Sequence, residues 1–282
     1  KHVMSLPTSQ SYQFSQEESR LFLDSIKFMY GYDFTEYAEA SVKRRIINFM
    51  HVHKIETLQE LSKLLLKEES MFEIFIQELS VTVTEMFRDP SFYKSLRENV
   101  MSRLATYPVI KVWVAGCATG EEVYSIAILL KEEGLLERSI IYATDINQKS
   151  ISIAKEGLYA VDNMKSYTSN YNEAGGKKSL SEYYISKYNA VLFDKSLRQN
   201  IVFSPHNLTV DKSFNEFQLV ICRNVLIYFN QELQNKVINL FHDSLCSFGF
   251  LALGNKESLL FTDKKKDFED IDKKERIFMK IQ

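Results

Sequence analysis

Apolar residues recur three or four positions apart over the first eighty residues of the chain, the spacing that places them on one face of a helix. This pattern predicts four helices, at 17–31, at 35–51, from about Thr57 onward, and at 71–79. Residues 1–14 are polar and weakly patterned, and we expect a mobile arm there. Because no strand-like alternation interrupts the helices, residues 15–90 are expected to form a helical domain.

The pattern changes at Pro108, after which short apolar runs alternate with stretches of helical spacing. The expected strands are 109–115, 139–144, 200–204, 217–222, 248–253 and 276–281, and the expected helices are 121–133, 147–157 and 230–247. Strands that alternate with helices indicate a mainly parallel sheet covered on both faces. We therefore expect residues 91–282 to form an α/β domain.

One segment, about 165–203, breaks this alternation. It contains a polar, glycine-containing stretch followed by short apolar runs at 183–185, 188–193 and 200–203. Successive short strands joined by polar turns are too close in sequence for parallel crossovers. We therefore expect an inserted small antiparallel β-subdomain here.

Composition excludes several classes of protein. With 45% hydrophobic and 26% charged residues, the chain has the balance of an ordinary globular protein. A net charge of only -2 gives no overall field that would recruit nucleic acid. No run approaches the roughly 20 apolar residues that span a bilayer, and the first residues lack the apolar core of a signal peptide. We expect a cytoplasmic protein that neither binds nucleic acid nor inserts into a membrane.

The cysteines and histidines give no sign of a metal site. Cys117, Cys222 and Cys246 are far apart and lack Cys-x-x-Cys spacing, which argues against both disulfides and zinc. Among the five histidines only His51 and His53 are close together, and side chains two positions apart on a helix point in different directions. We expect no bound metal.

The stretch 112–124 gives the first indication of chemistry. An apolar strand runs into a turn of small residues, from Gly116 to Gly120, and then into a helix. This arrangement presents backbone N–H groups to a nucleotide-like ligand. Asp145 ends the next apolar run, where a carboxylate can accept hydrogen bonds from ribose hydroxyls. Together these features indicate an adenosine-containing cofactor.

Two observations favour S-adenosylmethionine over a dinucleotide. The turn has two glycines and no Lys-Ser/Thr after Gly120, so it lacks the elements of a phosphate loop. Glu121 and Glu122 follow directly and would repel a pyrophosphate, whereas S-adenosylmethionine carries a sulfonium and an ammonium group and no phosphate. The alternative is a tight strand-to-helix connection that binds no ligand.

Six longer motifs follow one another along the chain. They are Thr82-Val83-Thr84-Glu85-Met86-Phe87-Arg88-Asp89-Pro90, Gly116-Cys117-Ala118-Thr119-Gly120-Glu121-Glu122-Val123-Tyr124-Ser125-Ile126-Ala127, Ala143-Thr144-Asp145-Ile146, His206-Asn207-Leu208, Cys222-Arg223-Asn224-Val225-Leu226-Ile227-Tyr228-Phe229 and Leu253-Gly254-Asn255-Lys256-Glu257-Ser258. In sequence and order they resemble the chemotaxis-receptor glutamate methyltransferases, the CheR family. The resemblance covers about residues 15–282 and implies a helical domain, a Rossmann-like S-adenosylmethionine domain and an inserted β-subdomain.

The resemblance implies an activity as well as a fold. Members of this family transfer a methyl group from S-adenosylmethionine to glutamate side-chain carboxylates of chemoreceptors, which is the adaptation step of chemotaxis signal transduction. The products are glutamate γ-methyl esters and S-adenosylhomocysteine. The implied partner is therefore the cytoplasmic domain of a methyl-accepting chemotaxis receptor.

The resemblance also assigns roles to individual residues. The implied cofactor-binding residues are Thr82, Thr84, Arg88, Glu121, Asp145, Asn207, Leu208, Asn224 and Val225. Arg88 and Tyr228 are implied to hold the substrate carboxylate in line with the methyl group, and a guanidinium suits that task because it can donate two parallel hydrogen bonds. The chain departs from the family pattern at Thr82, where many members have Asn, and at Met86, where they have Phe. Neither change removes a charged group, so we expect activity to survive.

A basic stretch, Lys43 to Arg45, lies on the second expected helix. The resemblance implies that Lys43, Arg44 and Arg45 contact the acidic methylation region of the receptor, and a solvated helix face is the plainer alternative. Two other functions stay open at this stage. The chain could methylate RNA or a small molecule, or it could be a non-catalytic regulatory module that binds S-adenosylmethionine.

Overall fold

The computed structural model describes residues 14–79 and 84–281, and its contacts divide the chain into two compact units, Lys1–Ser80 and Val81–Gln282. Each unit has its own hydrophobic core. The predicted arm, residues 1–14, lies outside the described residues except for Phe14, which is buried. None of the described helices is long and apolar enough to cross a membrane.

The first unit consists of helices whose ends follow from local sequence signals. They are α1 (Gln16–Tyr30), α2 (Glu39–Val52), α3 (Leu58–Lys67) and α4 (Glu69–Leu79). Ser15 and Thr57 begin α1 and α3 with complete capping boxes, and Gly31 ends α1 in the left-handed conformation. Helix α2 begins four residues later than expected, because Thr35 bonds through its N–H and hydroxyl to the Asp33 carboxylate and forms a turn instead.

The second unit is built around a seven-stranded sheet. Its strands are β1 (Ile110–Ala115), β2 (Ser139–Asp145), β6 (Ile201–Pro205), β7 (Phe217–Cys222), β8 (Leu245–Leu253), β9 (Phe268–Asp272) and β10 (Ile277–Lys280). They lie in the order β6-β2-β1-β7-β8-β10-β9. The first five of these are mutually parallel, and β10 is antiparallel to both of its neighbours. The predicted mainly parallel sheet is therefore confirmed.

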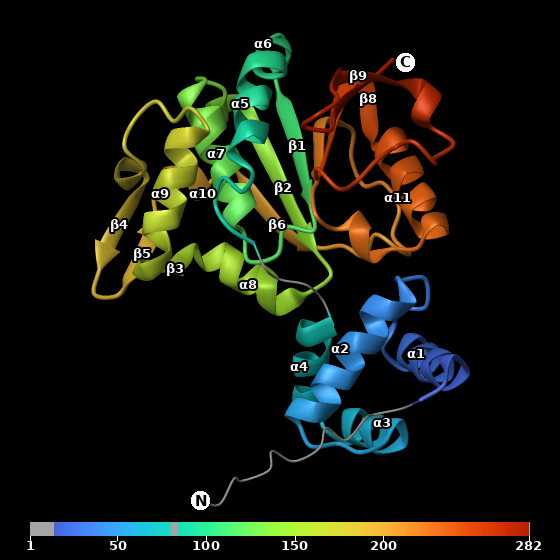
Figure 1. The fold of residues 1–282 in the computed structure, drawn as a ribbon. Helices are drawn as coiled ribbons and strands as arrows, with labels where there is room; N and C mark the ends of the chain where they lie inside the picture. Colours follow the sequence, from blue (N-terminus) through green and yellow to red (C-terminus); the bar gives the residue numbers. More distant parts are fainter. Residues whose placement is uncertain (1–13, 80–83, 282) are drawn as a thin grey trace, which may run out of the picture. The chain divides into compact units, whose positions relative to one another are not determined.

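Helices cover this sheet and close its core. They are α5 (Pro90–Asn99), α6 (Met101–Leu104), α7 (Glu121–Glu132), α8 (Gln148–Glu156), α9 (Met164–Glu173), α10 (Lys195–Arg198) and α11 (Gln231–Ser244). Helices α7 and α8 pack against β2, and α11 packs against β8 (Figure 1). Helix α7 is buried along most of its length, so its first turn is fixed rigidly at the end of β1.

A small antiparallel sheet is inserted beside the main one, as predicted. Its strands are β3 (Leu158–Ala160), β5 (Ala190–Phe193) and β4 (Tyr184–Lys187), in that order. It differs in one strand from the expectation for 165–203. Residues 201–205 pair in parallel with β2 in the main sheet, and Leu158–Ala160 supply the third strand of the small one.

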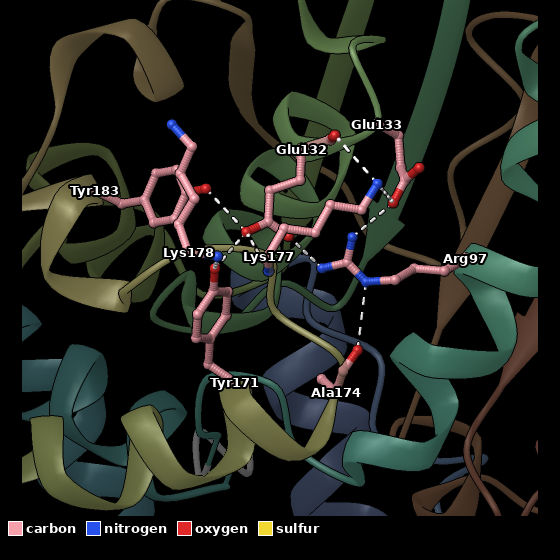
Figure 2. Close-up of polar contacts among 8 residues, drawn as sticks. All are labelled: Arg97, Glu132, Glu133, Tyr171, Ala174, Lys177, Lys178 and Tyr183. Carbon is pink, nitrogen blue, oxygen red and sulfur yellow. Dashed lines mark hydrogen bonds and ion pairs between the residues drawn. The ribbon is translucent and has the colours of Figure 1, made fainter.

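A polar cluster joins the inserted segment to the main body of this unit (Figure 2). The Glu132 carboxylate at the end of α7 accepts hydrogen bonds from the hydroxyls of Tyr171 and Tyr183, and it pairs with Arg97 of α5. Glu133 pairs with Arg97 at 2.7 Å and with Lys177 at 2.9 Å. Because the Glu132 side chain is almost fully buried, this cluster fixes α9 and the start of the small sheet to α5 and α7.

The boundary between the two units falls at a different place from the expected domain boundary at residue 90. The contacts assign 81–90 to the second unit. Met86 and Phe87 are completely buried in the core of that unit, and the Phe87 N–H donates to the hydroxyl of Ser125 on α7 at 2.9 Å. This segment therefore belongs to the surroundings of α7.

Candidate functional site

The loop between β1 and α7 is held in a shape that leaves little space for side chains. Gly116, Ala118 and Gly120 all have positive φ angles, of 74°, 45° and 96°. A Cβ atom on Gly116 would lie 2.4 Å from a methyl group of Val225, and one on Gly120 would lie 2.7 Å from the Cβ of Ala154. The loop therefore needs glycine at both positions, for close approach as well as for backbone conformation.

Asp145 ends β2 beside this loop. Its carboxylate accepts hydrogen bonds from the N–H groups of Ala118, at 2.9 Å, and Asn147, at 2.8 Å. Burial raises the pKa of Asp145, and these two backbone donors together with the Ile146 N–H oppose that shift without cancelling it. Helix α8 is capped by Asn147 itself, so Asp145 is not its cap. The loop and the start of α8 thus orient the Asp145 carboxylate, although Asp145 is not the residue that caps α8.

Glu121 and Glu122, the first residues of α7, have different surroundings. Glu121 is 6% exposed and its carboxylate accepts a hydrogen bond from the Thr119 hydroxyl at 2.7 Å. Burial raises the pKa of Glu121, and hydrogen bonds from Thr119 and Tyr167 lower it by less. Glu122 instead forms an ion pair with Arg223 at 2.6 Å. Glu122 is therefore committed to a structural contact, and Glu121 is the carboxylate beside the loop.

Arg88 lies on a segment that is fixed from both sides. Its neighbours Phe87 and Asp89 have positive φ angles of 51° and 56°, which is unusual outside glycine. The Arg223 guanidinium donates to the Arg88 carbonyl at 3.1 Å and pairs with the Asp89 carboxylate at 2.8 Å. The backbone that carries Arg88 is thereby tied to the end of β7. Thr84 is half-buried just before this segment, and Thr82 lies outside the described residues.

The segment after β6 carries Asn207 and Leu208. The His206 N–H donates to the Asp145 carbonyl at 3.1 Å, so this segment lies beside the end of β2. The Asn207 side-chain oxygen accepts from the N–H and the hydroxyl of Thr209, so this oxygen is engaged in a local turn. Leu208 is buried.

The turn after β7 carries Asn224, Val225 and Tyr228. Asn224 has a φ of 61°, and Tyr228 is the last residue of a short 3₁₀ helix, Leu226–Tyr228, in which it is half-buried. The carboxylate of Glu257 accepts hydrogen bonds from the N–H groups of residues 224, 225 and 226. The turn therefore has a fixed shape that a single buried side chain sets.

Apart from those in the segment 82–88, the candidate residues of the second unit thus lie at or just after the carboxyl ends of β1, β2, β6 and β7. In an open α/β sheet this edge is where ligands bind, at the point where the chain reverses the order of its strands. Here the reversal occurs at β1, whose neighbours are β2 on one side and β7 on the other. Two residues that shape this edge, Arg223 and Glu257, stand in the motifs quoted above, but no role was predicted for either one from the sequence. A charged residue next to the buried strand β7 was the available signal for Arg223.

The basic residues of α2 lie in the other unit and have local contacts. The Lys43 ammonium donates to the Phe14 carbonyl at 2.8 Å and lies over the Phe14 ring. Arg45 donates to the carbonyl of Leu79, the last residue of α4, and to the Ser41 hydroxyl. Arg44 is exposed. Two of the three residues therefore help to hold their own unit together.

The residues at the sheet edge fit S-adenosylmethionine. Glu121 and Asp145 are carboxylates with raised pKa values, and no ion pair to either one occurs within residues 14–79 and 84–281. A ligand that brings an ammonium group and ribose hydroxyls would satisfy both carboxylates, whereas a phosphate would be repelled. Fold and site together define the class of S-adenosylmethionine-dependent methyltransferases.

Comparison with known proteins places the chain more narrowly. The model of the CheR methyltransferase S-adenosylmethionine-binding domain matches residues 82–277, and that of the CheR all-alpha domain matches residues 17–80. The chain belongs to the CheR methyltransferase family. It is an S-adenosylmethionine-dependent chemotaxis protein methyltransferase, which confirms the family and the cofactor expected from the sequence.

Individual relatives agree with this assignment. Cher3 of Pseudomonas putida is 49% identical over 93% of this chain and 96% of its own length. The chemotaxis protein methyltransferase of Listeria innocua is 32% identical over 82% of this chain and 86% of its own length. Among solved structures, the N-methyltransferase NodS of Bradyrhizobium japonicum is 13% identical, with a TM-score of 0.34 over 60% of this chain and 62% of its own. That likeness is too weak to bear on function.

Proposed function

We propose that this protein methylates glutamate side chains in the cytoplasmic domain of a chemotaxis receptor and works in the cytoplasm. The observation that supports this most is the pair of carboxylates Glu121 and Asp145, which form no ion pair with any residue that the structure describes and lie beside a loop without a phosphate cradle. Membership of the CheR family supports the receptor as substrate.

The reaction needs little acid–base chemistry from the protein. When bound, S-adenosylmethionine supplies an electrophilic methyl group. A glutamate carboxylate has an ordinary pKa of about 4.3 and is already ionised at neutral pH, so no general base is needed. The reaction exchanges a carbon–sulfur bond for a carbon–oxygen bond without moving a proton. The residues of the site therefore bind, align and exclude water.

We assign these tasks to residues that lie at the sheet edge. Asp145 accepts hydrogen bonds from the ribose, Glu121 receives the ammonium group of the methionine portion, and Asn207 and Leu208 hold the adenine. Thr84, Asn224 and Val225 complete the cofactor site. Thr82, which lies outside the described residues, is proposed to belong to it as well. Arg88 and Tyr228 hold the substrate carboxylate, and the fixed backbone on both sides of Arg88 supports its role.

The basic residues of α2 are proposed to contact the receptor. A methylation region that presents several glutamates is acidic, and Arg44 is an exposed cation on this helix. Lys43 and Arg45 donate to carbonyl oxygens, and neither of these contacts is with an acidic group. All three residues therefore add to the positive potential of the helix, and Arg44 is the one placed for direct contact.

Labelling with methyl-tritiated S-adenosylmethionine tests the proposed function. The protein is incubated with receptor-containing membranes, and the labelled receptor band is then treated with mild alkali. We expect label on the receptor that alkali releases as methanol, because a carboxyl ester is base-labile. Label that resists alkali, or label on RNA or a small molecule, would contradict the assignment.

Replacing Tyr228 by Phe should lower kcat by about 100-fold and leave the affinity for S-adenosylhomocysteine nearly unchanged. The substitution removes only the hydroxyl, and a small loss of alignment of the carboxylate has a large effect on rate. Steady-state kinetics with the receptor, together with calorimetric titration of S-adenosylhomocysteine, would measure both quantities. Tyr188→Phe is the matched control, since Tyr188 is 89% exposed between the strands β4 and β5. Equal kcat values for the two variants would contradict the role of Tyr228.

A further inference from the structure

We infer that Glu257 is a positioning residue of the cofactor site, which acts by holding the turn of residues 224–226 in its binding conformation. This inference rests on the proposed cofactor contacts of Asn224 and Val225. Glu257 is only 4% exposed and lies in the loop after β8, on the far side of that turn from β1.

The Glu257 carboxylate accepts hydrogen bonds from four backbone N–H groups, two on each oxygen. One oxygen, Oε1, accepts from Val225 at 2.8 Å and Leu226 at 2.7 Å. The other, Oε2, accepts from Asn224 at 3.1 Å and from Gly254 in its own loop at 2.6 Å. Burial raises the pKa of Glu257, and the four donors oppose that shift. All four bonds need an acceptor, so an anionic carboxylate suits this place better than any neutral side chain.

Close packing between the two loops supports the same conclusion. A Cβ atom on Gly254 would lie 2.8 Å from Oε2 of Glu257 and 2.9 Å from the backbone nitrogen of Asn224. The loop after β8 therefore approaches the turn after β7 so closely that only glycine fits between them. Together with the left-handed conformation of Asn224, this contact leaves the turn one shape.

The consequence concerns the site more than the overall fold. A methyl group of Val225 packs directly against Gly116, only 2.4 Å from where a Cβ atom of that residue would lie. A shift of the turn 224–226 would therefore change the space beside the loop between β1 and α7. The same turn leads directly into the 3₁₀ helix that carries Tyr228. Glu257 itself contacts neither cofactor nor substrate. It determines the positions of Asn224 and Val225, which are proposed to bind the cofactor, and of Tyr228, which is proposed to bind the substrate.

Glu257→Gln tests this role, since an amide of the same shape presents one acceptor oxygen and turns an NH₂ group toward backbone donors. We expect the dissociation constant for S-adenosylhomocysteine to rise roughly tenfold or more, as small displacements of binding groups are costly. Calorimetric titration measures this without any methyl acceptor. If the original protein binds S-adenosylhomocysteine but methylates no receptor, the proposed function is wrong, while the inference about Glu257 still stands or falls with the affinity of Glu257→Gln.

Glu132→Gln is the matched control. Glu132 is also a buried carboxylate with several donors, but it lies at the other end of α7 from Glu121, about 17 Å away along the helix. Both variants should melt at lower temperature than the original chain, and only Glu257→Gln should lose affinity. If both lose stability and neither loses affinity, Glu257 is merely structural and the inference is wrong.

Should Glu257→Gln not fold, Gly254→Ala provides a second test. Its added methyl group would lie too close to Oε2 of Glu257 and would displace the carboxylate while retaining it. An unchanged affinity of Gly254→Ala for S-adenosylhomocysteine would also overturn the inference.

Discussion

Replacing Arg223 by Met should lower the free energy of unfolding by about 3 kcal/mol, the lower end of the cost of breaking a buried ion pair. The guanidinium is buried and pairs with Glu122 at 2.6 Å and Asp89 at 2.8 Å, and it lies 4.0 Å from the centre of the Phe92 ring. Burial is the largest single influence and would by itself lower the pKa of Arg223, but Glu122, Tyr93 and Asp89 together outweigh it and raise the pKa. Removing it leaves two carboxylates without their cation. We take the lower figure because the Asp89 side chain is one-third exposed.

The same substitution should reduce activity beyond its effect on folding, because Arg223 also holds the carbonyl of Arg88. Urea unfolding measures the stability, and kinetics below the unfolding temperature measure the activity. Arg138→Met is the matched control. Arg138 donates to the backbone carbonyls of Ala105 and Tyr107 at an exposed site, and its loss should cost less than about 1 kcal/mol. An Arg223→Met chain as stable as this control would show that the network contributes little.

Asp145→Ala should weaken binding of S-adenosylhomocysteine by roughly 10- to 100-fold, which corresponds to about 1.5–3 kcal/mol for hydrogen bonds to a charged group. The carboxylate lies at the end of β2, oriented by the N–H groups of Ala118 and Asn147. Titration calorimetry measures the affinity. Asp194→Ala is the control, because Asp194 caps α10 through the Ser196 N–H and precedes the amino end of β6, whereas the site lies at the carboxyl ends of the strands. Unchanged affinity in Asp145→Ala would exclude the ribose contact.

The raised pKa of Asp145 adds a pH dependence to this prediction. A carboxylate with a pKa above 3.8 becomes protonated at a higher pH than an ordinary aspartate. Affinity for S-adenosylhomocysteine should therefore be full near neutral pH and should fall as the pH drops through the raised value. The stability contribution has the opposite sign. The folded state binds this proton more tightly than the unfolded state, so the cost of burying the charged group is relieved in the same range. Asp145→Asn should remove the part of both effects that is due to this residue.

Local patterns predicted most of the fold. The strand expected at 109–115 and the helix expected at 121–133 are found at Ile110–Ala115 and Glu121–Glu132, because apolar runs and glycine positions determine both. Helix α9 was missed, since its ten residues are mostly polar and only Met164, Tyr167 and Tyr171 are buried. What fixes α9 is the cluster around Glu132, which no local signal could reveal.

The candidate site divides in the same way. Loop residues such as Gly116 and the acid Asp145 could be proposed from sequence, because the features that mark them lie in a single strand and the turn after it. The contacts of Arg223 join residues more than one hundred positions apart, and those of Glu257 join two separate loops. Only the folded chain brings such groups together. Sequence patterns can suggest which residues bind a ligand, but they rarely reveal the residues that hold those binding residues in position.

The position of β10 has a consequence for how the chain is made. This strand, Ile277–Lys280, lies between β8 and β9, although it follows both along the chain. Its Lys280 ammonium also donates to the carbonyls of His242 and Leu245, where α11 ends and β8 begins. During translation, β8 therefore has an open edge until residues 277–280 have emerged from the ribosome. We expect nascent chains stalled before that point to need chaperones to prevent edge-to-edge aggregation.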